Sequence, residues 1–224
     1  MYDWLIENAQ ILDGSGAPAF SGSVALAGGS VAAVGTLPGA RAVHTLDAAG
    51  RTLSPGFLDI HRHADLALLR PEFGAAELHQ GLTTVLNGNC GMAPAPLDGP
   101  FRKEIARYLA PVLGESPDCF PSLGAYLRRA EQTPLALHTG ELAGMGVLRA
   151  AVAGFEAGPL SSGQLRALRA LLERALGDGA LASLWGWAMR RSASTPRRSC
   201  SGRWRRCGTP ASCSPSICAR RATA

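Results

Sequence analysis

The sequence of 224 residues lacks long apolar segments, a secretion signal and a cysteine framework. It has no run of eighteen apolar residues, and its start at Met1 has neither the basic region nor the apolar block of a signal peptide. Only Cys90 and Cys119 lie outside residues 190–224, and two widely separated cysteines do not make a disulfide scaffold. We therefore expect a cytoplasmic chain with no membrane partner. Its hydrophobic content of 46% is enough to bury a core and excludes wholesale disorder.

Acidic residues are absent from residues 190–224, which contain nine arginines and no lysine. The formal net charge of +5 arises there, because the rest of the chain carries 13 basic and 17 acidic residues. The segment has Trp204 as its one aromatic residue and no Cys-X-X-Cys spacing, which argues against a nucleic-acid-binding arm and against a zinc element. We expect residues 186–224 to be disordered, or to come from a G+C-rich gene read out of frame, and we expect no nucleic-acid partner.

Two regimes follow one another along the chain. Short apolar runs separated by turn residues fill residues 1–53 and predict a small β-structure built from hairpins. From residue 54, apolar runs alternate with stretches of helical character, which predicts parallel βα units and an α/β fold. The expected strands are 57–60, 82–86, 135–137 and 181–184, and the expected helices are 66–80, 101–113 and 161–176. Four βα units are half of an eightfold barrel, so we expect the front half of a larger protein.

The last expected helix has the clearest boundaries. Leucines recur on one face from Leu165 to Leu176, and charged side chains lie off that face. Ser161 or Ser162 is available as the N-cap and Gly177 as the C-cap.

Metal-ligating side chains follow two of the expected strands. His61 and His63 end the first run, and because side chains two apart on a strand point to the same side, both imidazoles can reach one ion. Cys90 follows the second run in a glycine-rich turn, and a thiolate beside histidines is a good Zn²⁺ ligand. Taken by themselves, such motifs are more often a surface His-X-His without a ligand role and a small buried cysteine. His138 ends the third run. Three roles are open for it: a metal ligand, a substrate contact, or a core histidine bonded to a carbonyl.

Two longer segments resemble a known family. Ser-Pro-Gly-Phe-Leu-Asp-Ile-His-Arg-His at 54–63, after Asp-Ala-Ala-Gly at 47–50, resembles the motif with which the barrel of the amidohydrolase superfamily begins. Gly-Leu-Thr-Thr-Val-Leu-Asn-Gly-Asn-Cys-Gly at 81–91, with Ala-Pro at 93–94, is similar to the N-acyl-D-amino-acid deacylase (D-aminoacylase) branch. The resemblance covers about residues 3–184.

The resemblance implies the N-terminal half of a metal-dependent (β/α)₈ TIM-like barrel, preceded by a small β-sandwich segment. Residues 1–53 would form the N-terminal part of the small β-domain, and residues 54–185 the first βα units of the barrel. His61 and His63 would bind one metal site and Cys90 the tight zinc site, for one or two Zn²⁺ ions in a complete family member. The family's two further histidines and its general acid/base aspartate are not found in this chain, so we assign no catalytic residue, and the substrate-binding residues are unknown.

The function that the resemblance implies is metal-dependent hydrolysis of a carbon–nitrogen amide bond. The most specific expectation is deacylation of an N-acyl-D-amino acid, with a small-molecule N-acyl amino acid or related amide as the partner. We expect the chain by itself to be inactive, because most of the metal ligands are missing. Two alternatives stay open: a cyclic-amide hydrolase similar to dihydroorotase, which shares the His-X-His strand, and a non-catalytic metal-binding or interaction protein with a basic tail.

Overall fold

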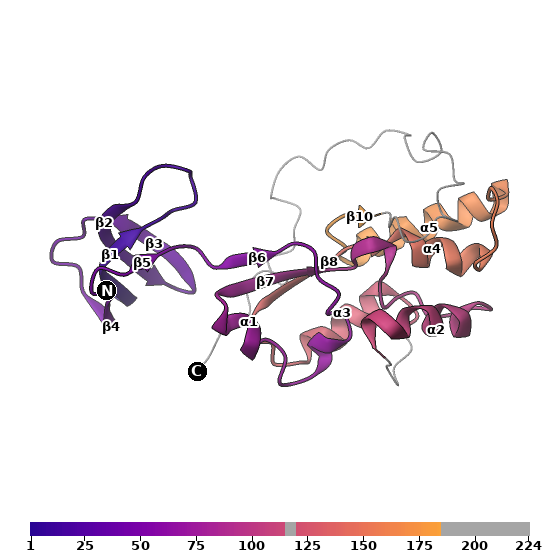
Figure 1. Ribbon diagram of the computed structural model, residues 1–224, viewed down its shortest axis with the longest axis horizontal. Helices are drawn as coiled ribbons and strands as arrows, with labels where there is room; N and C mark the ends of the chain where they lie inside the picture. Colours follow the sequence, from indigo (N-terminus) through magenta and orange to yellow (C-terminus); the bar gives the residue numbers. More distant parts are fainter. Residues whose placement is uncertain (115–119, 185–224) are drawn as a thin grey trace. The chain divides into compact units, whose positions relative to one another are not determined.

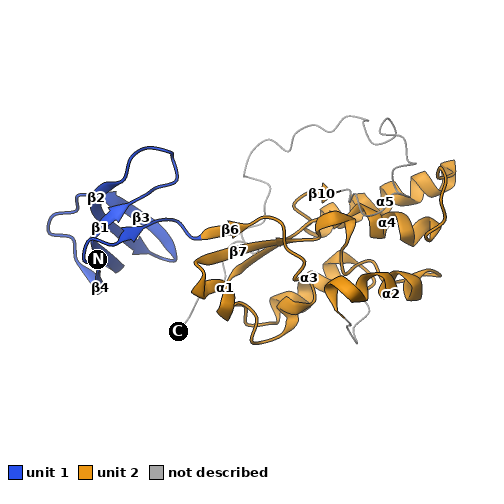
Figure 2. Ribbon diagram, in the orientation of Figure 1, with its two compact units in different colours: residues 1–56, 209–224 blue, residues 57–208 orange. Residues whose placement is uncertain are grey.

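The computed structural model describes residues 1–114 and 120–184. These residues form two compact units, one that ends at Gly56 and one that begins at Phe57 (Figure 2). The tail at 186–224, which we expect to be disordered or out of frame, lies outside the described residues. Within the described part of the chain, no helix is long and apolar enough to cross a membrane.

The first unit is a five-stranded mixed sheet. Its strands are β1 (Tyr2–Ile11), β2 (Phe20–Ala27), β3 (Ser30–Gly35), β4 (Ala42–Asp47) and β5 (Thr52–Leu53). The order is β3-β2-β1-β4, with β5 also beside β1, and the pairs β1–β2 and β2–β3 are antiparallel. Gly28 and Gly29 join β2 to β3 with φ values of 59° and 76°, as a tight hairpin turn requires. Ala9, Ile11 and Val24 form the buried centre of this unit.

The second unit is built on parallel strands. Strands β6 (Phe57–Asp59), β7 (Leu82–Asn87) and β8 (His138–Glu141) lie side by side in that order (Figure 1). A second parallel pair joins β9 (Ala143–Gly144) to β10 (Ser183–Leu184). The backbone N–H of Leu181 donates to the carbonyl of Glu141 at 2.9 Å, so the segment before β10 runs beside the end of β8. The α/β class predicted from the sequence is confirmed.

Helices connect these strands. They are η1 (Ala67–Leu69), α1 (Ala75–His79), η2 (Asn89–Gly91), α2 (Arg102–Leu113), α3 (Leu123–Glu131), α4 (Met145–Ala153) and α5 (Ser162–Asp178). The expected helix at 66–80 is wrong, because the chain forms only the short η1 and α1 there. Pro71 has no N–H to donate and Gly74 has a φ of 105°, so one helix cannot run through this stretch. The strand expected at 135–137 is also wrong, since β8 begins at His138.

Helix α5 begins where the sequence indicates. Ser161 accepts a hydrogen bond from the backbone N–H of Gln164, and the Gln164 side chain accepts one from the N–H of Ser161. This capping box satisfies N–H groups that have no partner inside the helix. The predicted C-cap at Gly177 is wrong, because the helix continues to Asp178 and the left-handed residue is Gly179, with a φ of 118°.

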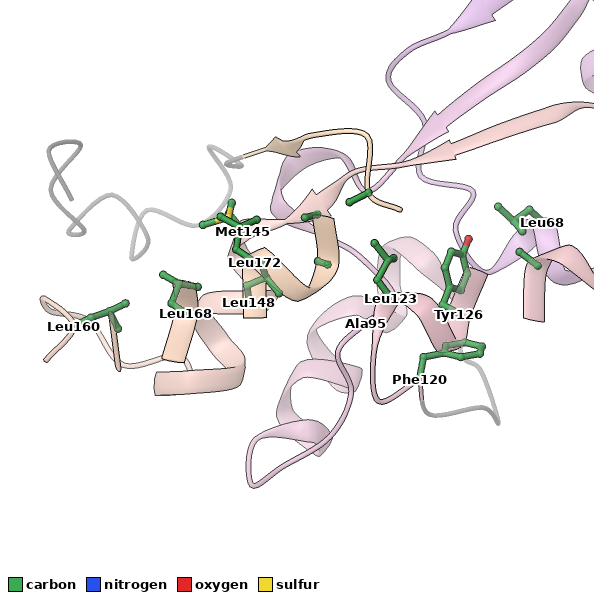
Figure 3. Packing of buried hydrophobic residues seen from close by; sticks show 14 residues of the cluster. Leu68, Ala95, Phe120, Leu123, Tyr126, Met145, Leu148, Leu160, Leu168 and Leu172 are labelled. Atoms are coloured by element: carbon green, nitrogen blue, oxygen red, sulfur yellow. The ribbon is translucent and has the colours of Figure 1, made fainter. Parts of the chain in front are cut away.

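The core of the second unit lies between its helices. The leucine face of α5 packs on α4 through Leu168, Leu172 and Leu148, while Phe120 and Tyr126 meet edge to face farther along the same cluster (Figure 3). A second cluster joins α2 to α4 and includes Met92, which lies two residues after Cys90. The helix layer is therefore packed directly against the turn that holds the cysteine.

Candidate metal centre

The two histidines and the cysteine come together at one edge of the parallel sheet. His61 and His63 follow β6, and Cys90 follows β7, so all three lie beyond the carboxyl ends of neighbouring parallel strands. Their ligating atoms all lie within 4.8 Å of one another. His61 Nε2 is 3.2 Å from Cys90 Sγ, and the two imidazole rings meet edge to face with their centroids 5.7 Å apart. His138 does not join them: it is exposed and begins β8, so it is not a core histidine and is not part of this cluster, while a role as a substrate contact stays untested.

The arrangement of donors fits a zinc ion. Zinc is bound by nitrogen at about 2.0–2.1 Å and by sulfur at about 2.3 Å, which places tetrahedral ligand atoms roughly 3.5 Å apart. The His61–Cys90 pair already has that spacing, and the widest separation requires a side-chain adjustment of about an ångström. His63 Nδ1 is buried and has no hydrogen-bond partner within the described residues. A buried nitrogen without a partner is costly unless a ligand satisfies it.

The turn that carries Cys90 has a strained backbone. Cys90 has a φ of 54°, in the left-handed region that non-glycine residues rarely adopt. Gly88, with a φ of 76°, begins the turn, and a Cβ there would lie 2.8 Å from the backbone nitrogen of Leu142 and still closer to its carbonyl oxygen. Glycine is therefore required at 88 by both conformation and packing. Strain of this kind persists where the surrounding structure fixes it, and it is common at functional sites.

Two asparagines tie the histidine loop to the cysteine turn. The Asn87 side chain is fully buried; its Oδ1 accepts from the N–H of Ala64, and its Nδ2 donates to Thr139 Oγ1 on β8. Asn89 Nδ2 donates to the carbonyls of Leu86 and Arg62. These bonds cross between the ends of β6, β7 and β8, so the positions of the candidate ligands are set by a buried polar network and not by packing alone.

Arg62 is held between the two histidines by acidic side chains. Its guanidinium pairs with Asp59 at 3.4 Å and with Glu77 of α1, whose side chain is 9% exposed. A buried carboxylate needs such a partner, because burial without one costs several kcal/mol. The pair therefore fixes the His61–His63 loop against α1.

Two carboxyl groups are buried directly behind this loop. Asp65 is 0% exposed and Glu141, at the end of β8, is 2% exposed. Asp65 Oδ1 accepts from the N–H of Gly88 at 3.0 Å, and Tyr126 Oη donates to the carbonyl of Asp65 at 2.7 Å. Asp65 Oδ2 and both side-chain oxygens of Glu141 have no hydrogen-bond partner within the described residues.

The environment of these carboxyl groups favours a shared proton. Burial raises the pKa of Glu141 well above its ordinary value, and the charge of Asp65 raises it further. Burial also raises the pKa of Asp65, against the hydrogen bonds it accepts. Burial and then the two carboxyl groups raise the pKa of Tyr126 well above 10. A protonated Glu141 can donate to Asp65, which lets one hydrogen bond satisfy both groups.

Sequence reasoning did not find Asp65, Glu141 or Tyr126. Asp65 had one available signal, its spacing of two residues from His63 in the pattern His-X-His-X-Asp. Glu141 had a weaker one, an acidic residue in an otherwise apolar stretch after the third run. Tyr126 had none, because its role depends on how α3 packs beneath the loop.

Comparison with known proteins gives these residues a context. No family model matches the chain. The chain is 38% identical over 180 residues to an N-acyl-D-aspartate deacylase of Alcaligenes xylosoxydans xylosoxydans, an alignment that covers 80% of this chain and 35% of that relative. The chain is homologous to the N-acyl-D-amino-acid deacylases. Solved structures agree, since the N-acyl-D-glutamate deacylase of Bordetella bronchiseptica, complexed with zinc and a phosphonate inhibitor, is 32% identical with a TM-score of 0.78.

A solved D-aminoacylase, described as defining a subset of amidohydrolases, also has a TM-score of 0.78 at 29% identity. The two structural matches cover 88% and 89% of this chain but 41% of each solved deacylase chain. The chain spans about a third of the length of the curated deacylases that it matches, 35–37%. The similarity therefore applies to the part of each deacylase that aligns with this chain, and not to the whole enzyme.

Proposed function

We propose that this chain provides part of the metal centre of an N-acyl-D-amino-acid deacylase, with His61, His63 and Cys90 as ligands of Zn²⁺. The observation that carries the proposal is the convergence of two imidazoles and a thiol within 4.8 Å, at the carboxyl ends of adjacent parallel strands. The zinc complex of the homologous N-acyl-D-glutamate deacylase supports the choice of metal. The remaining ligands and the general acid/base aspartate are assigned to a part of the enzyme that this chain does not supply.

The proposal includes a larger fold. Residues 54–185 would be the first βα units of a (β/α)₈ barrel, and residues 1–53 part of a small β-sandwich domain. The parallel order β6-β7-β8 supports the barrel, as does the segment before β10, which runs beside the end of β8. The candidate ligands also lie at the carboxyl ends of the strands, where the active sites of such barrels are found. Cytoplasmic location is part of the same proposal.

In this account the protein's own residues hold and orient the centre. A bound Zn²⁺ ion would polarise the amide carbonyl and lower the pKa of a water molecule. His61, His63 and Cys90 would hold the ion on one side, and the bonds from Asn87 and Asn89 would keep the two loops in register. The substrate would be an N-acyl-D-amino acid, the class named for the homologues.

The test replaces the corresponding part of the homologous N-acyl-D-aspartate deacylase with residues 1–184 of this chain. We expect zinc-dependent release of the amino acid from an N-acyl-D-amino acid, and loss of it with His61→Ala or Cys90→Ala. The change His44→Ala, at an exposed histidine of the first unit, is the control. A chimera that folds and binds zinc but hydrolyses only cyclic amides would favour the dihydroorotase-like alternative. One that hydrolyses neither would favour a non-catalytic metal-binding protein.

A further inference from the structure

Asp65 is a buried carboxylate that connects the two segments carrying the candidate metal ligands. It lies two residues after His63 and is 0% exposed. Its Oδ1 accepts a hydrogen bond from the backbone N–H of Gly88 at 3.0 Å. Gly88 begins the turn that holds Cys90, two residues farther along the chain. One side chain therefore joins the segment of His63 to the segment of Cys90.

The backbone of Asp65 is fixed from the helix layer. The hydroxyl of Tyr126, on α3, donates a hydrogen bond to the carbonyl of Asp65 at 2.7 Å. Tyr126 is 1% exposed and belongs to the buried cluster shown in Figure 3, where its ring meets that of Phe120 with centroids 5.4 Å apart. Buried hydrogen bonds with both partners satisfied make a core rigid. Asp65 is thus anchored to the core of the second unit and not only to its own loop.

The start of the cysteine turn has a second constraint, from the segment after β8. The backbone N–H of Leu142 donates to the carbonyl of Asn87 at 3.0 Å, and Gly88 lies so close to the Leu142 backbone that a Cβ has no room. This contact involves backbone atoms alone. The hydrogen bond from Gly88 to Asp65 is the constraint that depends on a side chain, so a substitution can remove it by itself.

The Cys90 backbone needs these constraints because it is strained. Its φ of 54° lies in the left-handed region, which is unfavourable for a non-glycine residue. Gly88 is buried, and without the Asp65 carboxylate its N–H would lose its acceptor, at a cost of the same order as that strain. A change of turn conformation would then relieve both. It would also move Cys90 Sγ, which is now 3.2 Å from His61 Nε2.

We propose that Asp65 is a positioning residue of the candidate metal centre, which keeps the Cys90 thiol at ligating distance from the two imidazoles, and that Tyr126 acts through Asp65. The proposal rests on the proposed function, because it takes His61, His63 and Cys90 as the ligands. It adds a metal preference. Thiolates favour zinc, whereas Mn²⁺ prefers oxygen ligands, so a centre that keeps its sulfur selects Zn²⁺ over Mn²⁺.

The test uses the whole chain with Co²⁺ as a probe in place of Zn²⁺. A thiolate bound to Co²⁺ gives a charge-transfer absorption band in the near ultraviolet, which reports the sulfur ligand directly. Asp65→Ala should weaken Zn²⁺ binding about 10- to 100-fold, the range for residues that orient metal ligands, and should lose most of the band at saturating Co²⁺. Asp65→Asn keeps an oxygen that can accept from the Gly88 N–H, so it should retain the band.

Asp178→Ala is the matched control. The Asp178 carboxylate also accepts from the N–H of a glycine in another element, that of Gly124 at 2.8 Å, where α5 meets α3. These two helices carry no candidate ligand. Asp178→Ala should lower the stability in urea but leave the band and the Zn²⁺ affinity unchanged. An equal loss of the band in Asp178→Ala and Asp65→Ala would show a general effect of stability and would overturn the positioning role.

Tyr126→Phe decides the question if Asp65→Ala fails to fold. It removes the hydroxyl that holds the Asp65 carbonyl and keeps the ring that packs on Phe120. The ratio of the Zn²⁺ and Mn²⁺ affinities, measured by calorimetry, should fall in Tyr126→Phe, and the thiolate band should weaken. An unchanged ratio together with an unchanged band would refute the role of Asp65, because both proposed effects pass through this hydrogen bond.

The wild-type chain separates this proposal from the proposed function. Co²⁺ bound by the wild type without a thiolate band would refute Cys90 as a ligand, and the role of Asp65 with it. A wild-type band that persists in folded Asp65→Ala would leave the ligands supported and refute only the positioning role. A band that is lost in Asp65→Ala and kept in Asp65→Asn is the result that we expect.

Discussion

Glu141→Gln tests the buried carboxyl pair behind the histidine loop. Glu141 is almost completely buried beside Asp65, and burial followed by the charge of Asp65 raises its pKa well above the ordinary value of 4.5. Glutamine has nearly the same shape and keeps an N–H donor for Asp65, but it cannot ionise. The substitution therefore removes a titrating group with little change in packing.

The raised pKa gives the stability a defined dependence on pH. Above about pH 4.5 the unfolded chain loses the Glu141 proton while the folded chain retains it, so the free energy of unfolding falls as the pH rises towards the folded pKa. The stabilisation is complete below the unfolded pKa. Each proton involved contributes a slope of about 1.4 kcal/mol per pH unit, so by pH 6 the wild type should lose up to about 2 kcal/mol relative to Glu141→Gln.

Urea unfolding followed by circular dichroism, on metal-free protein between pH 4.5 and 7.5, measures this difference. Glu173→Gln, an exposed change on α5, is the control and should leave the pH dependence of the wild type unaltered. We expect the free energy of unfolding of Glu141→Gln, relative to that of the wild type, to increase steadily as the pH rises. A constant difference across the range would show that Glu141 has the same protonation in the folded and unfolded states, contrary to the reasoning.

Three further predictions concern the scaffold of the site and α5. Gly88→Ala should destabilise the chain in urea by at least about 2 kcal/mol, more than Gly99→Ala, which has a similar φ of 78° but open space around it; equal losses would contradict the packing argument. Glu77→Gln should weaken zinc binding up to about 10-fold by releasing Arg62, and calorimetry showing unchanged affinity would exclude that role. Ser161→Ala should cost about 1 kcal/mol in urea unfolding while Ser161→Thr costs less, and no difference between them would argue against the cap.

Local sequence rules were enough to predict that three side chains would lie close together. His61, His63 and Cys90 are found together because a motif at the end of a strand needs only the strand and its neighbour to be correct. The start of α5 at Ser161 was predictable for a similar reason, since its capping box lies within four residues. Their assignment as zinc ligands stays a proposal.

Features that depend on tertiary contacts could not be predicted. His138 looked suitable because it ends an apolar run, but pairing with β7 sets the register of β8 and places Glu141 at the site edge instead. The run 135–137 therefore precedes the strand. Helices α3 and α4 escaped notice because their buried faces contain small and polar residues, including Arg149, whose guanidinium donates to the carbonyls of Glu156 and Gly158.

Zinc binding by the whole chain tests the central claim most directly. Calorimetry with Zn²⁺ should give a bound ion, and X-ray absorption at the zinc edge should show one sulfur at about 2.3 Å with nitrogen at about 2.0–2.1 Å. Cys90→Ala should remove the sulfur signal and weaken binding, while the exposed change His44→Ala should do neither. An ion coordinated only by oxygen, or an unchanged sulfur signal in Cys90→Ala, would contradict the assignment of His61, His63 and Cys90 as its ligands.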